Sequence, residues 1–199
     1  DFGLTDEAEV TAVMNGEADW MFDQPPTDRL GEIGTKFKDQ VYINNLTAWW
    51  YAPMNTRIAP FNNVKARQAV NFAIDRKALV NLFGGPALAA PVCQVLPPGF
   101  PGHQPFCLYT KDPGDKWSAP DIEKAKQLVE ESGTKGEKVT IIAEDTAVSK
   151  SIAVYLQSVL NEIGFQAEVK PISPNIQFTY IQNTNNKVQI SLTQWYQDY

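Results

Sequence analysis

Apolar residues recur every three or four positions in several stretches, which is the spacing that buries one face of an α-helix. The two longest stretches, residues 122–132 and 148–163, each end next to a glycine, a residue that closes many helices. Ser118 is predicted to cap the first of them. Shorter stretches predict helices over residues 5–15, 62–75, 75–83 and 175–182, and one beginning near Thr27 with that residue as its N-cap.

Runs of β-branched and aromatic residues predict strands between these helices. The expected strands are residues 18–22, 41–43, 47–54, 139–143, 165–170 and 188–195. From residue 139 to residue 170 the order is strand, helix, strand, which is a βαβ unit with a parallel, right-handed connection. The predicted fold class is therefore α/β, with a mixed β-sheet flanked by helices.

Small residues mark one face of the helix that an Asn caps near residue 62. They are Ala66, Ala69, Val70 and Ala73. Such a narrow stripe allows close packing, which we expect to be against a sheet. Asp75 follows the stripe, and it is expected to end this helix and to cap the short helix after it.

The bulk composition fits a globular domain and narrows the classes of partner. Of the 199 residues, 43% are hydrophobic, which is enough for a sizeable core. The net charge of −6 argues against a nucleic-acid partner, because such binding needs a basic face. No apolar run approaches the roughly 18 residues that cross a bilayer. The sequence has neither an initiator Met nor a signal peptide, so we expect a mature or excised piece of a longer protein.

The two cysteines bracket an irregular loop. Several Pro and Gly residues lie between Cys93 and Cys107, and they exclude a helix or a regular strand there. A disulfide would stabilise the fold by roughly 3 kcal/mol in the chain-entropy model, and it would mark an exported protein. The alternative is two free thiols in a cytosolic loop. The spacing does not suit a zinc site.

Residues that most enzymes and metalloproteins need are scarce. His103 is the single histidine, which disfavours a Ser-His-Asp or Cys-His centre and a His-rich metal site. We interpret it as a structural or solvated residue, with a ligand or catalytic role as the alternative. The sequence contains no G-x-G-x-x-G motif and no P-loop for a nucleotide. We therefore expect no enzyme activity, no cofactor and no metal site.

Aromatic residues are the candidates for a binding site. Trp49, Trp50 and Tyr51 are consecutive on a predicted strand, so at least one indole points away from the core. Either they wall a ligand, or one Trp is core and the other packs under a loop. Trp195 and Asp198 follow the end of the last strand, where ligands bind in open α/β sheets. Asp198 would pair with a ligand ammonium group or, alternatively, lie in a solvated connector.

Six segments, in order, resemble the extracellular solute-binding proteins of ABC importers, in the peptide/nickel class. The most specific is residues 66–76 (A-R-Q-A-V-N-F-A-I-D-R), which is similar to the family's v-R-q-A-l-x-y-A-I-D-r segment. The others are residues 54–56 with 60–61, 97–99, 125–133, 156–164 and 195–199.

The resemblance implies one lobe of a two-lobe clamshell of the periplasmic-binding-protein type, class II-like. Such a receptor closes on its ligand by hinge motion and delivers it to an ABC permease in the membrane. Residues 1–199 would form a single α/β lobe of a larger protein, with residues 1–45 including a hinge-proximal or partner-lobe segment. The second lobe would come from the rest of the same chain. The protein would be an exported monomer, periplasmic or at the cell surface, with a lipid anchor as one option.

The resemblance also implies roles for individual residues. Asp198 would pair with the α-ammonium group of a small peptide, and Trp195 would be a cleft aromatic with Tyr199 beside it. Independently of the resemblance, we expect the strand with Trp49, Trp50 and Tyr51 to wall the same cleft. Residues 191–194 are uncharged, whereas some peptide binders carry basic residues there, so this strand offers no cation to a peptide carboxylate. The cysteine pair is not general to the family and would mark a subgroup.

Three alternative hypotheses stay open. The same class of receptor could bind another solute, such as an oligosaccharide or a metal chelate. An α/β hydrolase or transferase domain would need a nucleophile and a base, which the sequence does not offer. A structural interaction module would need no ligand site.

Overall fold

The computed structural model describes residues 3–21, 23–42 and 46–197, and the chain divides into two compact units. Unit 1 comprises residues 1–44 and unit 2 comprises residues 45–199. The elements of unit 1 are α1 (Asp6–Met14), α2 (Leu30–Lys36) and the 3-10 helix η1 (Lys38–Gln40). The assignment of residues 1–45 to a hinge-proximal or partner-lobe segment stays a prediction.

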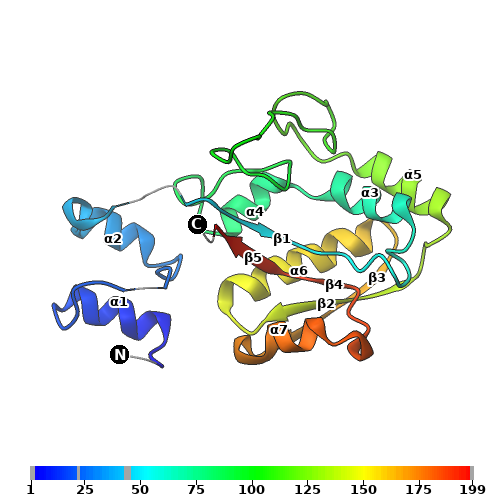
Figure 1. Ribbon diagram of the computed structural model, residues 1–199. Helices are drawn as coiled ribbons and strands as arrows, with labels where there is room; N and C mark the ends of the chain where they lie inside the picture. Colours follow the sequence, from blue (N-terminus) through cyan, green and yellow to red (C-terminus); the bar gives the residue numbers. More distant parts are fainter. Residues whose placement is uncertain (1–2, 22, 43–45, 198–199) are drawn as a thin grey trace. The chain divides into compact units, whose positions relative to one another are not determined.

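Unit 2 holds the α/β fold (Figure 1). Its elements, in chain order, are β1 (Ala48–Tyr51), α3 (Val64–Ala73), α4 (Arg76–Leu82), α5 (Ile122–Ser132), β2 (Lys138–Glu144), α6 (Ala147–Glu162), β3 (Gln166–Ile172), α7 (Pro174–Gln182), the 3-10 helix η2 (Thr184–Asn186), β4 (Ile190–Ser191) and β5 (Thr193–Tyr196). The predicted α/β class is confirmed.

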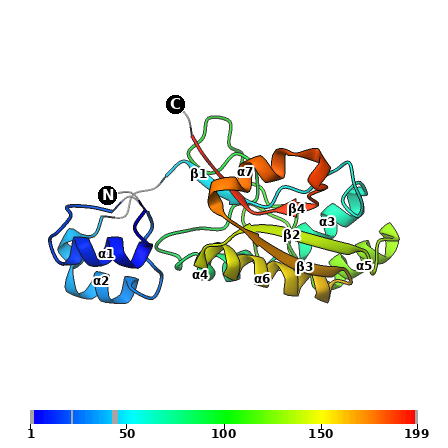
Figure 2. The ribbon, with the colours of Figure 1, turned by 90° about the horizontal axis from the view of Figure 1, so that it is seen from below.

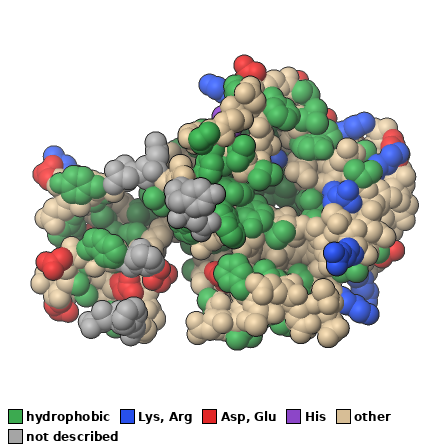
Figure 3. Space-filling model, viewed as in Figure 1, with side chains coloured by type: hydrophobic (Ala, Val, Ile, Leu, Met, Phe, Trp, Pro, Cys, Tyr) green, Lys and Arg blue, Asp and Glu red, His purple; other side chains and the backbone are tan. Residues whose placement is uncertain are grey.

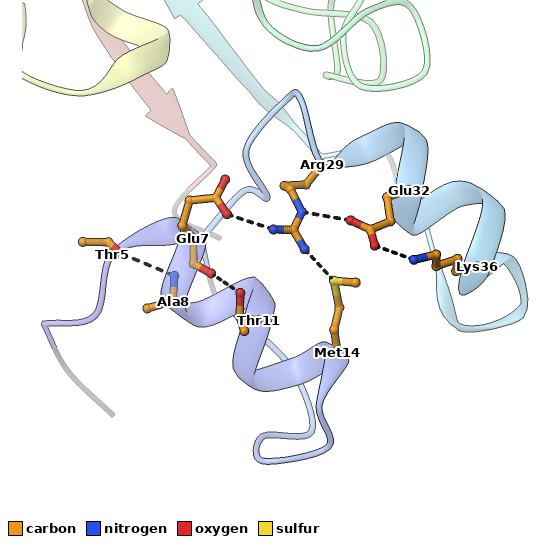
Figure 4. Close-up of polar contacts among 8 residues, drawn as sticks. All are labelled: Thr5, Glu7, Ala8, Thr11, Met14, Arg29, Glu32 and Lys36. Carbon is orange, nitrogen blue, oxygen red and sulfur yellow. Dashed lines mark hydrogen bonds and ion pairs between the residues drawn. The ribbon is translucent and has the colours of Figure 1, made fainter.

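Arg29 links the two helices of unit 1 (Figure 4). Its Nη1 lies 3.1 Å from Oε2 of Glu7 on α1, and its Nε lies 3.2 Å from Oε2 of Glu32 on α2. Its Nη2 lies 3.3 Å from the sulfur of Met14. Lys36 bonds the same Glu32 at 2.8 Å, and this bond and charge, with a smaller contribution from Arg29, hold the pKa of Glu32 below its ordinary value. These contacts fix α1 against α2.

Two strands and one helix cap predicted in unit 1 are wrong. Residues 18–21 and 41–42 are irregular, and the remaining residues of those predictions, Phe22 and Ile43, lie outside the described residues. Helix α2 begins at Leu30, and neither Thr27 nor any other side chain caps it. β-Propensity misled here because a strand also needs a hydrogen-bonding partner. The described part of unit 1 contains no strand to serve as one.

The described part of unit 2 contains two sheets, one parallel and one antiparallel. Strands β3, β2 and β4 lie side by side in that order and run parallel, while β1 and β5 pair antiparallel. The segment after β1 lies next to β4, because Met54 forms an isolated antiparallel bridge with Ile190. Helix α6 covers one face of the parallel strands and α7 covers the other (Figure 2). Because both faces are covered, residues 141–143 at the centre of β2 are buried in succession.

Helix α3 packs mainly on α5. Ala66, Ala69 and Ala73 are each at most 1% exposed, which confirms the predicted small-residue stripe. Their partner is a helix, however, and the predicted packing against a sheet is wrong. Small side chains reduce the distance between two helix axes, so they suit this contact as well as they suit a sheet. The helix cap predicted at Ser118 is also wrong, because Asp121 caps α5.

Asp75 caps α4, as predicted. Its carboxylate accepts hydrogen bonds from the N–H groups of Lys77 at 2.9 Å and Ala78 at 3.1 Å. The hydroxyl of Tyr155 on α6 accepts from the Asp75 N–H at 2.8 Å and donates to the Asp75 carbonyl at 3.4 Å. Burial raises the pKa of Tyr155, so the phenol keeps the proton that it donates. The turn between α3 and α4 is therefore tied to α6.

The last strand changes partner at Leu192. The sequence predicts one strand over residues 188–195, but the structure divides it into β4 and β5. The Leu192 N–H donates to the carbonyl of Ile142 on β2 at 3.0 Å. The Leu192 carbonyl accepts from Nε2 of Gln177 on α7 at 2.6 Å, and both residues are buried. Gln177 therefore satisfies a carbonyl at the point where the chain passes from one sheet to the other.

We predict that Gln177→Met, which keeps the side-chain length and removes the donor, lowers the free energy of unfolding by about 1–3 kcal/mol. The reason is that the buried carbonyl of Leu192 is left without its partner. Urea unfolding measures the change. Gln182→Met, at an exposed position on the same helix, is the matched control. Equal stability of the two variants would contradict this role.

Glu144 ends β2, and burial raises the pKa of its carboxyl above the ordinary value. The folded chain then holds this proton more tightly than the unfolded chain, so its stabilising effect is present at low pH and is lost as the pH rises through the folded pKa. We predict that Glu144→Gln has a higher Tm than wild type at pH 7 and the same Tm below about pH 4. The control is Glu137→Gln, at an exposed position before the same strand. A gain in Tm that does not change with pH would refute the assignment.

Candidate functional site

Three aromatic side chains share one face of the β1/β5 ribbon. The register places Trp49 directly opposite Trp195 and Tyr51 opposite Thr193. Residues opposite each other in an antiparallel pair point to the same face, as do residues two apart on one strand. The rings of Trp49 and Tyr51 are 5.8 Å apart, Tyr51 is 38% exposed and Trp195 is 49% exposed. We call Trp49, Tyr51 and Trp195 the aromatic wall.

The ribbon extends beyond its regular strands, because the N–H of Gln197 donates to the carbonyl of Thr47 at 3.0 Å. Pairing therefore continues up to the segment that carries Asp198. Asp198 and Tyr199 themselves lie outside the described residues. Their predicted roles stay predictions.

Trp50 lies on the opposite face of the ribbon. Its ring meets that of Phe83, at the end of α4, edge to face with centroids 5.5 Å apart. Tyr196 shares this second face, is 52% exposed and donates to Oε1 of Gln194 at 3.2 Å. The structure thus brings Trp49, Tyr51 and Trp195 together and separates Trp50 from them. Tyr196 was missed by sequence reasoning, although strand alternation next to Trp195 could have identified it.

Hydrophobic side chains gather on the face of unit 2 seen in Figure 3, over β1, β5 and the neighbouring loop. The exposed large apolar residues of unit 2 include Tyr51 and Trp195, which share one face of this ribbon. Contiguous apolar surface of this kind favours binding of a ligand or a partner. The ribbon is therefore the candidate site.

The predicted disulfide between Cys93 and Cys107 is confirmed. Cys107 is 1% exposed, and its backbone pairs with Gly114 in an isolated antiparallel bridge. Within the loop, Nδ1 of His103 lies 2.8 Å from the carbonyl oxygen of Leu96, which fits the structural interpretation of this histidine. The loop closed by Cys93 and Cys107 is called the disulfide loop.

One residue of the disulfide loop packs on the aromatic wall. The ring of Phe100 meets that of Trp49 edge to face, with centroids 6.3 Å apart. Sequence reasoning missed Phe100, because no local pattern indicates which distant strand an irregular loop contacts. Trp49 is half-buried and is partly covered by this ring. Neither Trp49 nor Trp50 is a fully buried core residue.

Arg76 anchors the base of the disulfide loop to α4. Its Nη1 donates to the carbonyl of Val92 at 2.6 Å, and burial lowers the pKa of the guanidinium. Next to it, the ammonium group of Lys77 lies 5.8 Å from the ring centre of Trp117. A cavity of about 400 Å³, lined mostly by Pro and apolar side chains that include Trp117, lies beside the disulfide.

The described residues supply no group of three His, Cys, Asp or Glu side chains that could hold a metal ion. Among the helices that the structure describes, none has the length and apolar character needed to cross a membrane. The site that the geometry does offer is a set of uncharged rings, suited to apolar and aromatic contact.

Comparison with known sequences supports the resemblance noted above. The family model described as "Bacterial extracellular solute-binding proteins, family 5 Middle" matches residues 2–199. The probable peptide ABC transporter periplasmic-binding protein y4tO of Sinorhizobium fredii is 34% identical over 171 residues, which are 83% of this chain and 30% of that protein. The chain therefore spans less than a third of this relative.

Solved structures share the fold. The ABC transporter substrate-binding protein CtaP of Listeria monocytogenes is 26% identical, with a TM-score of 0.72 over 95% of this chain and 38% of that one. A dipeptide-binding protein from Pseudoalteromonas sp. SM9913, in complex with Met-Leu, is 22% identical, with a TM-score of 0.76 over 100% of this chain and 38% of that one. The family match across residues 2–199, together with the 34% identical relative, shows that the chain belongs to the bacterial extracellular solute-binding proteins, family 5.

Proposed function

We propose that this chain is part of the ligand-binding region of an ABC-importer receptor, and that its ligand is a small peptide. The observation that carries the proposal is the aromatic wall. Trp49, Tyr51 and Trp195 stand on one face of a two-stranded ribbon, and two of them are more than a third exposed. Exposed rings held on paired strands can bind a ligand with little loss of side-chain entropy.

The relatives favour a peptide over other solutes. The Sinorhizobium fredii protein is named a probable peptide ABC transporter periplasmic-binding protein. The disulfide supports export, because such bonds persist mainly in oxidising compartments. A receptor of this kind passes its ligand to a membrane permease, and it needs no catalytic group.

The mechanism follows from the chemistry of the wall. A peptide has a polar backbone, a terminal ammonium group and side chains of varied character. The rings of the wall would cover side chains or backbone and exclude water as the receptor closes. Excluding water strengthens any ion pair nearby. We assign the ion pair to Asp198, which would accept hydrogen bonds from the peptide α-ammonium group.

The test is a thermodynamic cycle that combines one substitution in the protein with one change in the peptide. Affinities are measured by isothermal calorimetry on the full-length protein. A synthetic library of free di-, tri- and tetrapeptides is screened, and the tightest-binding peptide is compared with its N-acetylated form. Asp198→Asn is expected to lower the affinity for the peptide with a free N-terminus by roughly 10- to 100-fold, because it removes a charged hydrogen bond. The same substitution is expected to leave the affinity for the acetylated peptide unchanged.

Asp112→Asn, at an exposed loop position, is the matched control and should change neither affinity. An equal loss for both peptides would show that Asp198 does not bind the ammonium group. Absence of peptide binding, together with binding of an oligosaccharide or a metal chelate, would replace the peptide by another solute in the same class of receptor.

A further inference from the structure

The disulfide loop contacts β1 through Phe100, and the residue before it, Gly99, lies near Thr47. The ring of Phe100 meets Trp49, with centroids 6.3 Å apart and an angle of 89° between the rings. A Cβ placed on the preceding residue, Gly99, would lie 4.0 Å from Cγ2 of Thr47, which is an ordinary contact distance. Thr47 comes directly before β1, and its carbonyl accepts a hydrogen bond from the N–H of Gln197. The ring of Trp49 stands on the face of the ribbon that carries the aromatic wall. The loop therefore lies on the face of the ribbon that carries the aromatic wall.

Gly99 has a structural reason to be a glycine. Its φ is +99°, a conformation that residues with a Cβ rarely adopt. Gly99 lies in a turn, in which the N–H of Phe100 donates to the carbonyl of Pro97 at 3.3 Å. The residue that meets Trp49 therefore directly follows a turn that favours glycine.

The disulfide loop is braced along its length. The Cys93–Cys107 disulfide closes it. The side-chain amide of Gln94 donates to the backbone carbonyls of Gln104 and, at 3.1 Å, Phe106. The Phe100 carbonyl accepts from the N–H of His103 at 3.1 Å. These contacts fix the loop independently of the ribbon, so the loop can hold a ring against it.

We propose that Phe100 is a positioning residue, which holds the indole of Trp49 in its binding orientation and depends on the Cys93–Cys107 disulfide to do so. The proposal rests on the proposed peptide function. Phe100 is not a member of the aromatic wall. Its ring packs edge to face on the indole of Trp49, so any effect on the ligand is transmitted through Trp49. A ligand would then meet an indole whose rotation is already restricted, and restricting a group before binding lowers the entropy cost of binding.

The test reads the position of Trp49 directly. The full-length protein is labelled with 5-fluorotryptophan, and the resonance of Trp49 is assigned by its loss in Trp49→Phe. Phe100→Ala is expected to shift this resonance. It is also expected to lower the affinity for the tightest-binding library peptide by roughly 2- to 10-fold, which corresponds to the loss of one aromatic pair. Phe100→Tyr, which keeps the ring, should leave both the Trp49 resonance and the peptide affinity at their wild-type values. The double variant Cys93→Ser/Cys107→Ser should move the resonance in the same direction as Phe100→Ala.

The matched control is Phe106→Ala, which removes a half-exposed ring from the same loop. It should leave the resonance and the affinity at wild-type values, and the Tm of both Ala variants is measured to separate positioning from stability. A Trp49 resonance that Phe100→Ala leaves unmoved would overturn the proposal, as would an equal shift in Phe106→Ala. The resonance needs no ligand, so failure of the peptide function appears separately, as a wild-type protein that binds no library peptide.

Discussion

The backbone of Leu192 is the constraint on which the candidate site depends. Its N–H completes the pairing with β2, through Ile142, and its carbonyl is satisfied by the buried amide of Gln177. A buried carbonyl without a partner costs free energy comparable to a lost hydrogen bond. With both groups satisfied, the chain can leave the parallel sheet after Ser191 and pair with β1 from Thr193 onward. That change of partner places Trp195 directly opposite Trp49 in the β1/β5 pair.

The site is consequently assembled from three distant parts of the chain. Trp49 and Tyr51 come from β1, Trp195 from β5, and Phe100 from the loop between α4 and α5. The loop and β5 each have an anchor outside the ribbon. Arg76 and the disulfide hold the loop, while Gln177 and β2 hold the start of β5. Rigid elements thus support rings that stay partly exposed, which is what a preformed binding wall requires.

Much of the fold of unit 2 could be predicted because its signals are local. Such local signals are the apolar spacing of α5 and α6, the cap at Asp75 and the alternation of β3. The strands predicted in unit 1 failed for the opposite reason, since pairing decides a strand and pairing is not local. The partner of α3 was mistaken because a stripe of small residues fits a helix as well as a sheet.

The same distinction applies to the site. Aromatic composition pointed to Trp49, Tyr51 and Trp195, but the register that puts Trp49 opposite Trp195 depends on the change of strand partner at Leu192, which no periodicity reveals. The contact of Phe100 joins a loop and a strand about fifty residues apart, and only tertiary packing determines it. The roles of Asp198 and Tyr199 stay predictions drawn from the resemblance of the terminal segment to the family.

The most direct measurement is a crystal structure of the full-length protein with its tightest-binding library peptide. The account predicts peptide atoms in contact with the rings of Trp49 and Trp195, within about 4.5 Å. A peptide bound elsewhere, with the aromatic wall left facing solvent, would contradict it.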